Sequence, residues 1–532
     1  MKHVFRATFL VVLSCSLLAL AQQGRPRSVG GAQTAVTVEE IDGAKLQMAQ
    51  AGEGAAASDP VSFNSTDKKF RGWKVVIPGN RPLATPAVVD GRVYVGGGFG
   101  SHEFYAFDAA TGKKIWEYKT ADDGPTAAAV QDGYVAFNTE SCEIEILTVD
   151  GKPVWKKWLG DPLMSVPAIG NGKVYQAYPD SKGDHKYYLA CFDLKTGAEQ
   201  WKKPIASEII TTPVLADDQV YLATLDGTLY CFNQKEGQLV WTKKQNATSS
   251  PVVWRGECYF SKRKEVMLAQ AGKAVLQQNE ALGVTTNNVV IAQNYALAGG
   301  QGGGVAAPAA GMAVFGQPGR ATNYNVDRLE TKELVETERK ADYLDTKKRA
   351  ALSKQEMANA VNDAAVGFGG NSKGSFGFQA ASNVGQATVA GVWAYQGSKP
   401  FIGDNRLLSS MGDTLTCVDA RSEKVLWKKA LHPKGSKPEE LLDSVLTPPA
   451  LVNGKVFLGT TYGAVLCLSA DSGELLWSVN IGEAIQFQPA VAKGRVYVST
   501  STGHLYCIET GDSKDDGWLM WGANAGHNGL LK

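Results

Sequence analysis

The sequence predicts an all-β protein, an eight-bladed β-propeller of four-stranded antiparallel blades with a partly helical insertion after blade five. Three observations support this prediction. A phrase ending in Trp recurs along the chain, two short β-branched runs precede each copy, and turns such as Asn-Gly or Asp-Gly divide those runs. A repeat of about forty residues built from four short strands is typical of a propeller blade.

The recurring phrase joins the third and fourth strands of each expected blade. Its Asp can bond turn amides, its Gly permits a left-handed turn, and its Trp can pack flat on the neighbouring blade. Five copies stand out: AFDAATGKKIW at 106–116, CFDLKTGAEQW at 191–201, CFNQKEGQLVW at 231–241, CVDARSEKVLW at 417–427 and CLSADSGELLW at 467–477.

From these copies, and from a shortened one that ends at residue 155, we expect six indoles to act as wedges between blades. A second interpretation is that some of these rings stack on a ligand. The predicted blade-docking residues are Trp116, Trp155, Trp201, Trp241, Trp427 and Trp477.

The two runs ahead of each phrase are expected to form a β-hairpin. Asp90-Gly91 and Asn171-Gly172 are examples of the dividing turn, and such dipeptides are the strongest short-range hairpin signal. Blade five is degenerate and lacks the Trp. The expected blades lie at about 85–120, 126–160, 165–205, 211–245, 249–276, 399–427, 446–482 and 486–521.

The ring must also close, because open sheet edges invite aggregation. The segment GWKVVIPG at 72–79 has no preamble of its own and is similar to the fourth-strand phrase LLWSVNIG at 475–482. We expect it to supply the outer strand of the last blade. The predicted propeller regions are therefore 70–276 and 397–532, and the Ala-, Gly- and Gln-rich residues 22–69 are predicted to be flexible.

The Asp-x-x-Thr-Gly-x-x-x-Trp phrase resembles the tryptophan-docking motif of PQQ-like repeat propellers. That superfamily includes the quinoprotein alcohol dehydrogenases and the propeller lipoprotein of the outer-membrane β-barrel assembly machinery. The resemblance covers roughly 70–276 and 397–525. It implies the fold and leaves the function open, because one fold hosts many activities.

Two functions are compatible with this resemblance. The dehydrogenases hold pyrroloquinoline quinone with calcium in the central channel, beside two adjacent, disulfide-linked cysteines. This sequence has no adjacent pair of cysteines, and we assign it no catalytic, cofactor-binding or metal-ligating residue. The preferred hypothesis is a non-catalytic, protein-binding or scaffolding module of the cell envelope; the alternative is a quinone-dependent dehydrogenase oxidising an alcohol or sugar.

Composition and the first residues bear on location. The net charge of +1 provides no basic field for nucleic acid. Residues 1–21 have a basic start, an apolar run and an Ala-Leu-Ala site, as in a secretory signal peptide, so the expected location is the periplasm or cell envelope without a membrane span in the mature chain. A lipoprotein cleaved before Cys15 is the alternative.

Most of the eight cysteines fall within the repeat. Cys191, Cys231, Cys417 and Cys507 occupy one place in the third strands of different blades, and Cys467 is expected one step along its own motif. Because equivalent positions in different blades point apart, buried free thiols are expected rather than disulfides.

The insertion and the C-terminus are the remaining features. Residues 277–396 include a charged stretch at 327–365 that favours one long or two shorter amphipathic helices. This insertion is either a solvated addition with a helix lying on the propeller, or a partner-binding arm or oligomerisation helix. The expected partners are other envelope proteins or peptides, bound through the propeller faces or through this insertion. Near the C-terminus, Trp518 and Trp521 are expected to cap the last blade, and His527 is a weak candidate for a substrate contact.

Overall fold

The computed structural model describes most of the two predicted propeller regions. The described ranges are 36–49, 59–266, 275–285, 400–436 and 446–529, with gaps at 99, 161–164, 181, 210, 225, 245–246, 248, 282–283, 412 and 423.

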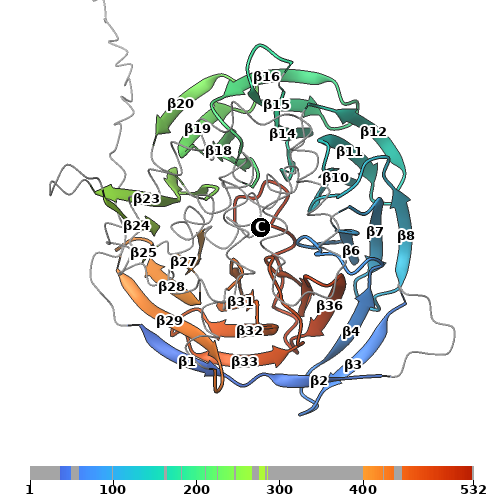
Figure 1. The fold of residues 1–532 in the computed structure, drawn as a ribbon, viewed down its shortest axis with the longest axis vertical. Coiled ribbons are helices and arrows are strands. Elements are labelled where there is room, and N and C mark those ends of the chain that lie inside the picture. Colours follow the sequence, from blue (N-terminus) through green and yellow to red (C-terminus); the bar gives the residue numbers. More distant parts are fainter. Residues whose placement is uncertain are drawn as a thin grey trace, which may run out of the picture.

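Sheets follow one another around a ring, each with its first strand near the centre and its fourth strand at the perimeter (Figure 1). This arrangement is a β-propeller, and it confirms the predicted fold class. The first blades are β5 (Ala87–Val89), β6 (Arg92–Gly96), β7 (Glu103–Asp108) and β8 (Lys114–Lys119); β9 (Ala129–Gln131), β10 (Tyr134–Asn138), β11 (Glu143–Thr148) and β12 (Pro153–Trp158); β13 (Ala168–Gly170), β14 (Lys173–Pro179), β15 (Tyr187–Asp193) and β16 (Glu199–Ile205); and β17 (Val214–Ala216), β18 (Gln219–Ala223), β19 (Thr228–Asn233) and β20 (Leu239–Lys244).

Three more four-stranded arrays lie in the second half of the chain, and strands from the N-terminal part extend their sheets. They are β26 (Phe401–Gly403), β27 (Arg406–Met411), β28 (Thr414–Asp419) and β29 (Val425–Pro433); β30 (Ala450–Val452), β31 (Lys455–Gly459), β32 (Ala464–Ser469) and β33 (Leu475–Asn480); and β34 (Ala490–Ala492), β35 (Arg495–Ser499) and β36 (His504–Glu509) with β4 (Arg71–Val76).

Between the fourth and sixth positions of the ring lies a less regular unit. The pair β21 (Val252–Trp254) and β22 (Glu257–Tyr259) precedes a three-stranded sheet of β23 (Ser261–Val266), β24 (Val275–Ala281) and β25 (Val284–Thr285). Strand pairing thus continues past residue 276, where we expected the insertion to begin. The count of eight blades stays a prediction, and the predicted helix at 327–365 lies outside the described residues.

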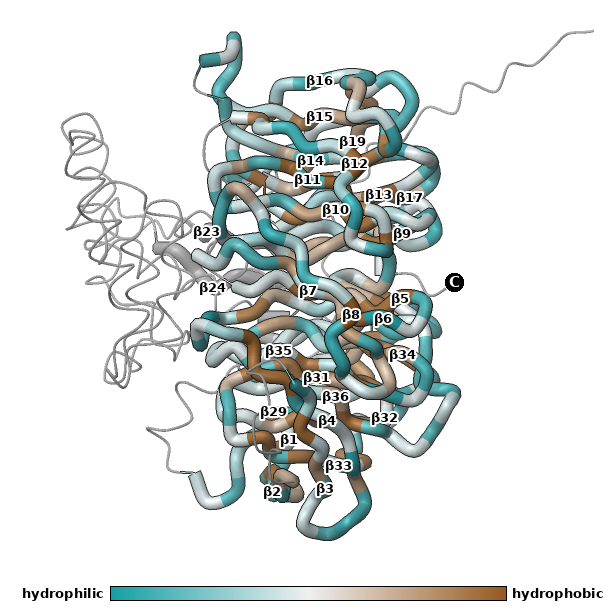
Figure 2. Tube along the Cα trace, turned by 90° about the vertical axis from the view of Figure 1, so that its right-hand side faces the viewer, coloured by the Kyte–Doolittle hydropathy of each residue, from teal (hydrophilic) through white to brown (hydrophobic). Residues whose placement is uncertain are grey.

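Local sequence explains the blade geometry. The hairpin turn Asp90-Gly91 has φ angles of 50° and 76°, the pair of positive values that a tight two-residue turn needs. The middle strands β6 and β7 are almost wholly buried, while the outer strand β8 alternates exposed and half-buried residues. The apolar core is therefore the set of interfaces between facing blades (Figure 2).

The last blade is closed by the N-terminal part of the chain. β4 pairs antiparallel with β36, with Trp73 opposite Cys507, so the segment expected to supply the outer strand does so. Since this pairing joins residues far apart in the sequence, it locks the ring shut. β34 also lies against β5, next to the first blade.

The prediction of a flexible segment over 22–69 is wrong for residues 36–49 and 59–69. β1 (Thr37–Ile41) pairs in parallel with β29, β2 (Ala44–Met48) pairs in parallel with β33, and β3 (Val61–Ser65) pairs antiparallel with β4. Their composition is polar because one side of each strand faces solvent. Backbone pairing at the sheet edge keeps these three strands in place with few buried side chains. The buried residues in them are Ile41, Phe63 and Ser65.

The described part of the chain contains no helix with the length and apolar character that crossing a membrane would require.

Removing the closing strand should destabilise the ring. A chain beginning at Arg81 lacks β1–β4 and leaves the β36 edge unpaired, so we expect a lower melting temperature and concentration-dependent association. The measurements are thermal unfolding and sedimentation velocity. A chain beginning at Val36, which keeps all four strands, is the control; equal stability of the two shortened chains would refute the closure.

Candidate functional site

The predicted indoles lie at the boundaries between blades, and four of them make the same pair of contacts. The indole N–H of Trp155 donates to the carbonyl of Leu194, and that of Trp201 donates to Gln234, at 2.8 and 3.1 Å. Trp116 and Trp427 donate in the same way to Val149 and Ala470, both at 3.0 Å. Each acceptor belongs to the turn between the third and fourth strands of the next blade.

The glycine of each turn lies directly beneath the ring. A Cβ built on Gly237 would lie 2.5 Å from the Trp201 ring, and one on Gly197 would lie 2.7 Å from the Trp155 ring. Both glycines have positive φ angles, of 64° and 70°. Glycine is therefore needed twice at this position, once for the backbone and once for the close approach of the indole.

The Asp of the phrase holds this turn in shape, as we expected. Asp193 Oδ1 accepts hydrogen bonds from the backbone N–H of Lys195 and from both the N–H and the hydroxyl of Thr196, at 3.1, 2.8 and 2.8 Å. These hydrogen bonds, with those to the Thr196 hydroxyl first, lower the pKa of Asp193. Asp108 makes the equivalent set of bonds.

The other two predicted indoles differ. Trp477 lies 5.0 Å from the ring of Phe70, because the fourth strand of the next blade comes from β4 and that blade has no phrase turn to receive it. Trp241 packs against Tyr221 in its own blade and against the edge of the fifth unit, whose corresponding turn lies outside the described residues. The stabilising role of all six indoles stays a prediction.

Sequence reasoning missed one docking indole, Trp73 of the closing strand. Its N–H donates to the carbonyl of Ala109 at 3.3 Å, and its ring lies over Gly112. The sequence did offer a signal: Trp73 lies in a segment similar to the fourth-strand phrase at 475–482, which contains Trp477. The ring is thus sealed by the same contact that joins its other blades.

Five of the described cysteines share one register position opposite a Trp: Cys191, Cys231, Cys417, Cys467 and Cys507. Cys467 pairs with Trp477 just as Cys191 pairs with Trp201, so the expectation that Cys467 is displaced by one step is wrong. The described cysteines are free thiols, and burial raises the pKa of Cys191 to about 12. A buried, protonated thiol of this kind is a packing group.

The C-terminal segment lies at the hub of the ring rather than at the edge of the last blade. Figure 1 shows the end of the chain at the centre, and Figure 2 places it on the side of β9, β13 and β17. Carbonyls of this segment accept hydrogen bonds from the N–H groups of Val491, Val88, Ile169 and Leu215, at 2.6 to 2.8 Å. These donors belong to four different innermost strands, so the segment ties the blades together from inside.

Two indoles and one imidazole anchor this segment. Trp518 and Trp521 are 1% exposed, and their rings lie 5.0 and 6.0 Å from the Phe401 ring. Trp518 pairs with Val491 of β34, so it does lie against the last blade, but at the innermost strand of that blade and not alongside the closing strand β4 as we expected. His527 is fully buried, with Nδ1 2.6 Å from the Trp521 carbonyl and Nε2 2.8 Å from the Pro167 carbonyl. The imidazole is thus a structural bridge across the hub.

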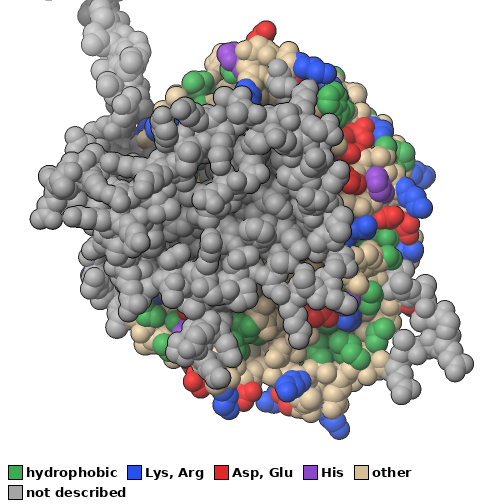
Figure 3. All heavy atoms as spheres, in the orientation of Figure 1, with side chains coloured by type: hydrophobic (Ala, Val, Ile, Leu, Met, Phe, Trp, Pro, Cys, Tyr) green, Lys and Arg blue, Asp and Glu red, His purple; other side chains and the backbone are tan. Residues whose placement is uncertain are grey.

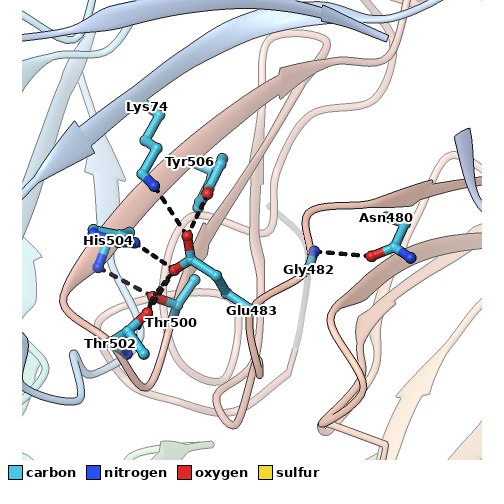
Figure 4. A network of polar contacts seen from close by, with 8 residues as sticks. All are labelled: Lys74, Asn480, Gly482, Glu483, Thr500, Thr502, His504 and Tyr506. Carbon is cyan, nitrogen blue, oxygen red and sulfur yellow. Dashed lines mark hydrogen bonds and ion pairs between the residues drawn. The ribbon is translucent and has the colours of Figure 1, made fainter. Parts of the chain in front are cut away.

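A second polar centre surrounds Glu483 in the loop between β33 and β34 (Figure 4). Its carboxylate accepts hydrogen bonds from Lys74 Nζ at 3.0 Å and from the hydroxyl of Tyr506 at 2.7 Å. Further bonds come from the hydroxyls of Thr500 and Thr502 and from the His504 ring. The residues come from β4, β36 and two loops.

This carboxylate is held ionised. Burial would raise the pKa of Glu483, but hydrogen bonds from His504, Thr502, Tyr506 and Lys74 outweigh it and hold the pKa far below its ordinary value near 4.5. A carboxylate with so many donors is a poor proton acceptor. The arrangement fits a structural anchor that fixes the closing strand to the preceding loop, not a general base.

A third polar group combines Asp122, Asp123 and Glu140. Two hydrogen bonds join their loops: Ser141 N donates to the side-chain Oδ2 of Asp122, and Glu140 N donates to the Asp123 carbonyl, both at 2.8 Å. Burial, with Asp123 and Asp122 close by, raises the pKa of Glu140 to about 8. Figure 3 shows acidic side chains gathered on this side of the face, over β7, β10 and β11.

Among the residues that the structure describes, no group of three or more His, Cys, Asp or Glu side chains is placed to hold a metal ion. The structure thus contains docked indoles, a filled hub, the Glu483 anchor and an acidic group around Glu140. Together with the ring of blades, the docked indoles define a propeller with PQQ-like repeats.

Comparison with known proteins identifies the family. The family model described as outer membrane protein assembly factor BamB matches residues 62–148, 142–310 and 411–526. Because these matches span more than half of the chain, the chain belongs to this family.

Individual relatives are distant. BamB of Burkholderia pseudomallei is 23% identical over 222 residues, which are 32% of this chain and 58% of that protein. BamB of Yersinia pestis is 23% identical and is matched over 53% of its length, by 37% of this chain. The chain thus spans just over half the length of these curated relatives. Quinohemoprotein alcohol dehydrogenase ADH-IIG of Pseudomonas putida is 29% identical over 139 residues, 22% of this chain and 19% of that enzyme.

Solved structures resemble the chain at low identity. BamB from Moraxella catarrhalis has a TM-score of 0.43 and 14% identity, with 82% of this chain and 96% of that chain covered. Quinohemoprotein alcohol dehydrogenase from Comamonas testosteroni has a TM-score of 0.42 and 13% identity, with 83% and 76% covered.

The glycine beneath each indole gives a direct test of the docking contact. Gly237→Ala adds a methyl group that would collide with the Trp201 ring, whereas Gly172→Ala, at a similar φ of 69°, meets nothing within 4 Å. We expect Gly172→Ala to cost about 1 kcal/mol of unfolding free energy from backbone strain and Gly237→Ala about 2–4 kcal/mol. Equal losses in chemical denaturation would contradict the docking geometry.

The hydrogen bonds of Glu483 predict that the difference in unfolding free energy between the native protein and Glu483→Gln depends on pH. Because its pKa is lowered on folding, its contribution is complete above about pH 4.5 and is lost as the pH falls further. Glu483→Gln should lower the unfolding free energy by about 1–3 kcal/mol at pH 7, and this gap should narrow between pH 5 and pH 2. Denaturation curves across this range measure it.

The matched control is Glu117→Gln, which removes a carboxylate that bridges the nearby Lys114 on the surface. This variant should stay within about 0.5 kcal/mol of the native protein. A gap for Glu483→Gln that stays constant down to pH 2 would mean that the carboxylate is not the source of the stabilisation.

Proposed function

We propose that this chain is a non-catalytic propeller of the bacterial cell envelope that binds other envelope proteins and holds them in a complex. The observation that carries this proposal is its membership in the BamB family, with matches in both halves of the ring. The names of its relatives refer to assembly at the outer membrane. Export through the signal sequence at 1–21 is part of the same proposal.

The occupied hub favours binding over catalysis. The resemblance to quinoprotein dehydrogenases implies a cofactor in the central channel. In this chain, Trp518, Trp521 and His527 fill one end of the hub with buried side chains. A scaffold loses nothing by this filling, because partners of a propeller bind its loops and its perimeter.

The hydrogen-bonded carboxylate of Glu483 also supports a scaffold function. Glu483 is a partly buried acid whose pKa is lowered, and its oxygens already accept bonds from five side chains. Ordering a carboxylate in this way rigidifies a loop between two blades. A rigid loop surface is a good platform for a partner, since little conformational freedom is lost on binding.

The cofactor test separates the scaffold from the dehydrogenase. Purified protein incubated with pyrroloquinoline quinone and Ca²⁺ should show no stoichiometric quinone absorption after gel filtration and should not reduce an artificial electron acceptor with alcohols or sugars. A quinoprotein alcohol dehydrogenase treated in parallel is the positive control. Stoichiometric uptake with dye reduction would overturn the proposal.

A binding assay addresses the scaffold directly. Tagged full-length chain, cross-linked in envelope preparations of its own organism, should recover outer-membrane assembly proteins in defined ratios. Recovery of the chain alone, at cross-linker levels that capture known envelope complexes, would count against a scaffold.

A further inference from the structure

The perimeter of the ring has covered and open edges. Strands β1, β2 and β3 lie against the outer strands β29, β33 and β4, as the blue strands in Figure 1 show. In the described residues, the outer strands β8, β12, β16 and β20 have no such neighbour. An open strand edge presents unpaired N–H and carbonyl groups, and it is a ready template for another strand.

The chain itself shows what such an edge accepts. β1 has the sequence TVEEI and adds to β29 in parallel, with Thr37 opposite Lys429 and Val38 opposite Ala430. The Glu39 carboxylate lies 3.6 Å from Lys429 Nζ, and the Thr37 hydroxyl donates to the Lys428 carbonyl at 3.2 Å. A β-branched, acidic strand thus fits an edge that carries Trp-Lys-Lys.

β12 repeats that edge at the second blade. Trp155-Lys156-Lys157 occupies the positions that Trp427-Lys428-Lys429 occupies in β29, and both indoles are docked on the next blade. The charge that attracts Glu39 to Lys429 is therefore present again, without a strand across it. In β29 the next residue is Ala430, but in β12 it is an aromatic residue.

That residue is Trp158, whose side chain is unusually open. It is 58% exposed, yet its indole N–H donates to the carbonyl of Ser141 at 2.8 Å, so the ring is held in place. Val154 of the same strand is also exposed, at 36%. A fixed, exposed indole loses little freedom when a partner covers it, and Trp is enriched among residues that dominate binding energy.

The other open edges lack this combination. In β16 the residue after the two lysines is Pro204, not an exposed aromatic residue. In β8, Glu117 follows the Trp and pairs with Lys114 at 2.8 Å. In β20, Trp241 is followed by Thr242, and no exposed aromatic residue follows the lysines.

We propose that the outer edge of β12 binds an extended, acidic, β-branched segment of a partner protein by parallel strand addition. An apolar side chain of that segment lies opposite Trp158, as Val38 lies opposite Ala430, and a carboxylate pairs with Lys157, as Glu39 pairs with Lys429. This inference rests on the proposed function, because it gives the scaffold a binding surface and a class of partner.

The test uses a fluorescent peptide with the sequence of residues 36–42, VTVEEID, and the full chain. Hydrogen exchange of the backbone N–H groups in 153–158 should slow when the peptide is present, and anisotropy should give a salt-sensitive affinity. Trp158→Ala should weaken binding at least tenfold without changing the melting temperature. Leu239→Ala, which removes another exposed side chain (52%), from β20, is the matched control and should bind like the native protein.

Charge exchange tests the pairing. Lys157→Glu should weaken the binding of the acidic peptide. The basic peptide VTVKKID should bind the Lys157→Glu variant more tightly than it binds the native protein. Protection confined to β29, or equal affinity of Trp158→Ala and the native protein, would overturn the inference. Because these measurements need no envelope partner, their failure leaves the proposed function standing, while quinone uptake would remove the proposed function and leave peptide binding intact.

Discussion

The packing of an indole on the glycine turn of the next blade is the contact on which the rest of the structure depends. It combines a flat apolar contact with a hydrogen bond from the indole N–H to a turn carbonyl, and it recurs from Trp73 through Trp427. Side chains at this contact join successive blades in most of the ring, and strand pairing through β2 and β3 also links the blade of β33 to the blade of β36. The angle between neighbouring sheets is therefore set by this contact, and with it the closure of the ring.

A β-bulge accompanies this contact in the regular blades. The register between the third and fourth strands shifts just after the pair Cys191–Trp201, and again after Cys417–Trp427. A bulge increases local twist and re-aims the side chain beside it. The bulge is absent where Cys507 pairs with Trp73. That fourth strand comes from the N-terminal part of the chain, so no tight turn connects it to the third strand.

The repeat made the fold predictable, and features outside the repeat were the ones mispredicted. Each docking Trp has a fixed distance from its turn, so Trp116, Trp155, Trp201 and Trp427 could be placed from sequence alone. β1 and β2 could not, since strands bound at an edge need little apolar sequence and look like a polar linker. Pairing partners almost four hundred residues away leave no local signal.

The structure of the hub was also hard to predict from the sequence, because it too depends on contacts between distant segments. The sequence predicts that Trp518 and Trp521 cap the last blade, but their position depends on backbone bonds to innermost strands of several blades, which no local pattern encodes. The Glu483 anchor was missed entirely, because its donors come from Lys74, from the Thr500–Thr502 turn and from β36. Polar networks assembled from distant segments appear only once the ring is built.

Both ends of the described chain serve the ring, and this limits where a partner can bind. The C-terminal segment fills the hub, and the N-terminal strands cover the edges of the last blades, so among the four-stranded blades that the structure describes the open outer edges belong to β8, β12, β16 and β20. A partner that adds a strand there gains main-chain hydrogen bonds without displacing any described part of the chain. Among those edges, only β12 joins a Trp-Lys-Lys run to an exposed indole. On this edge the indole can add binding energy for a partner strand, and the lysines can select an acidic one.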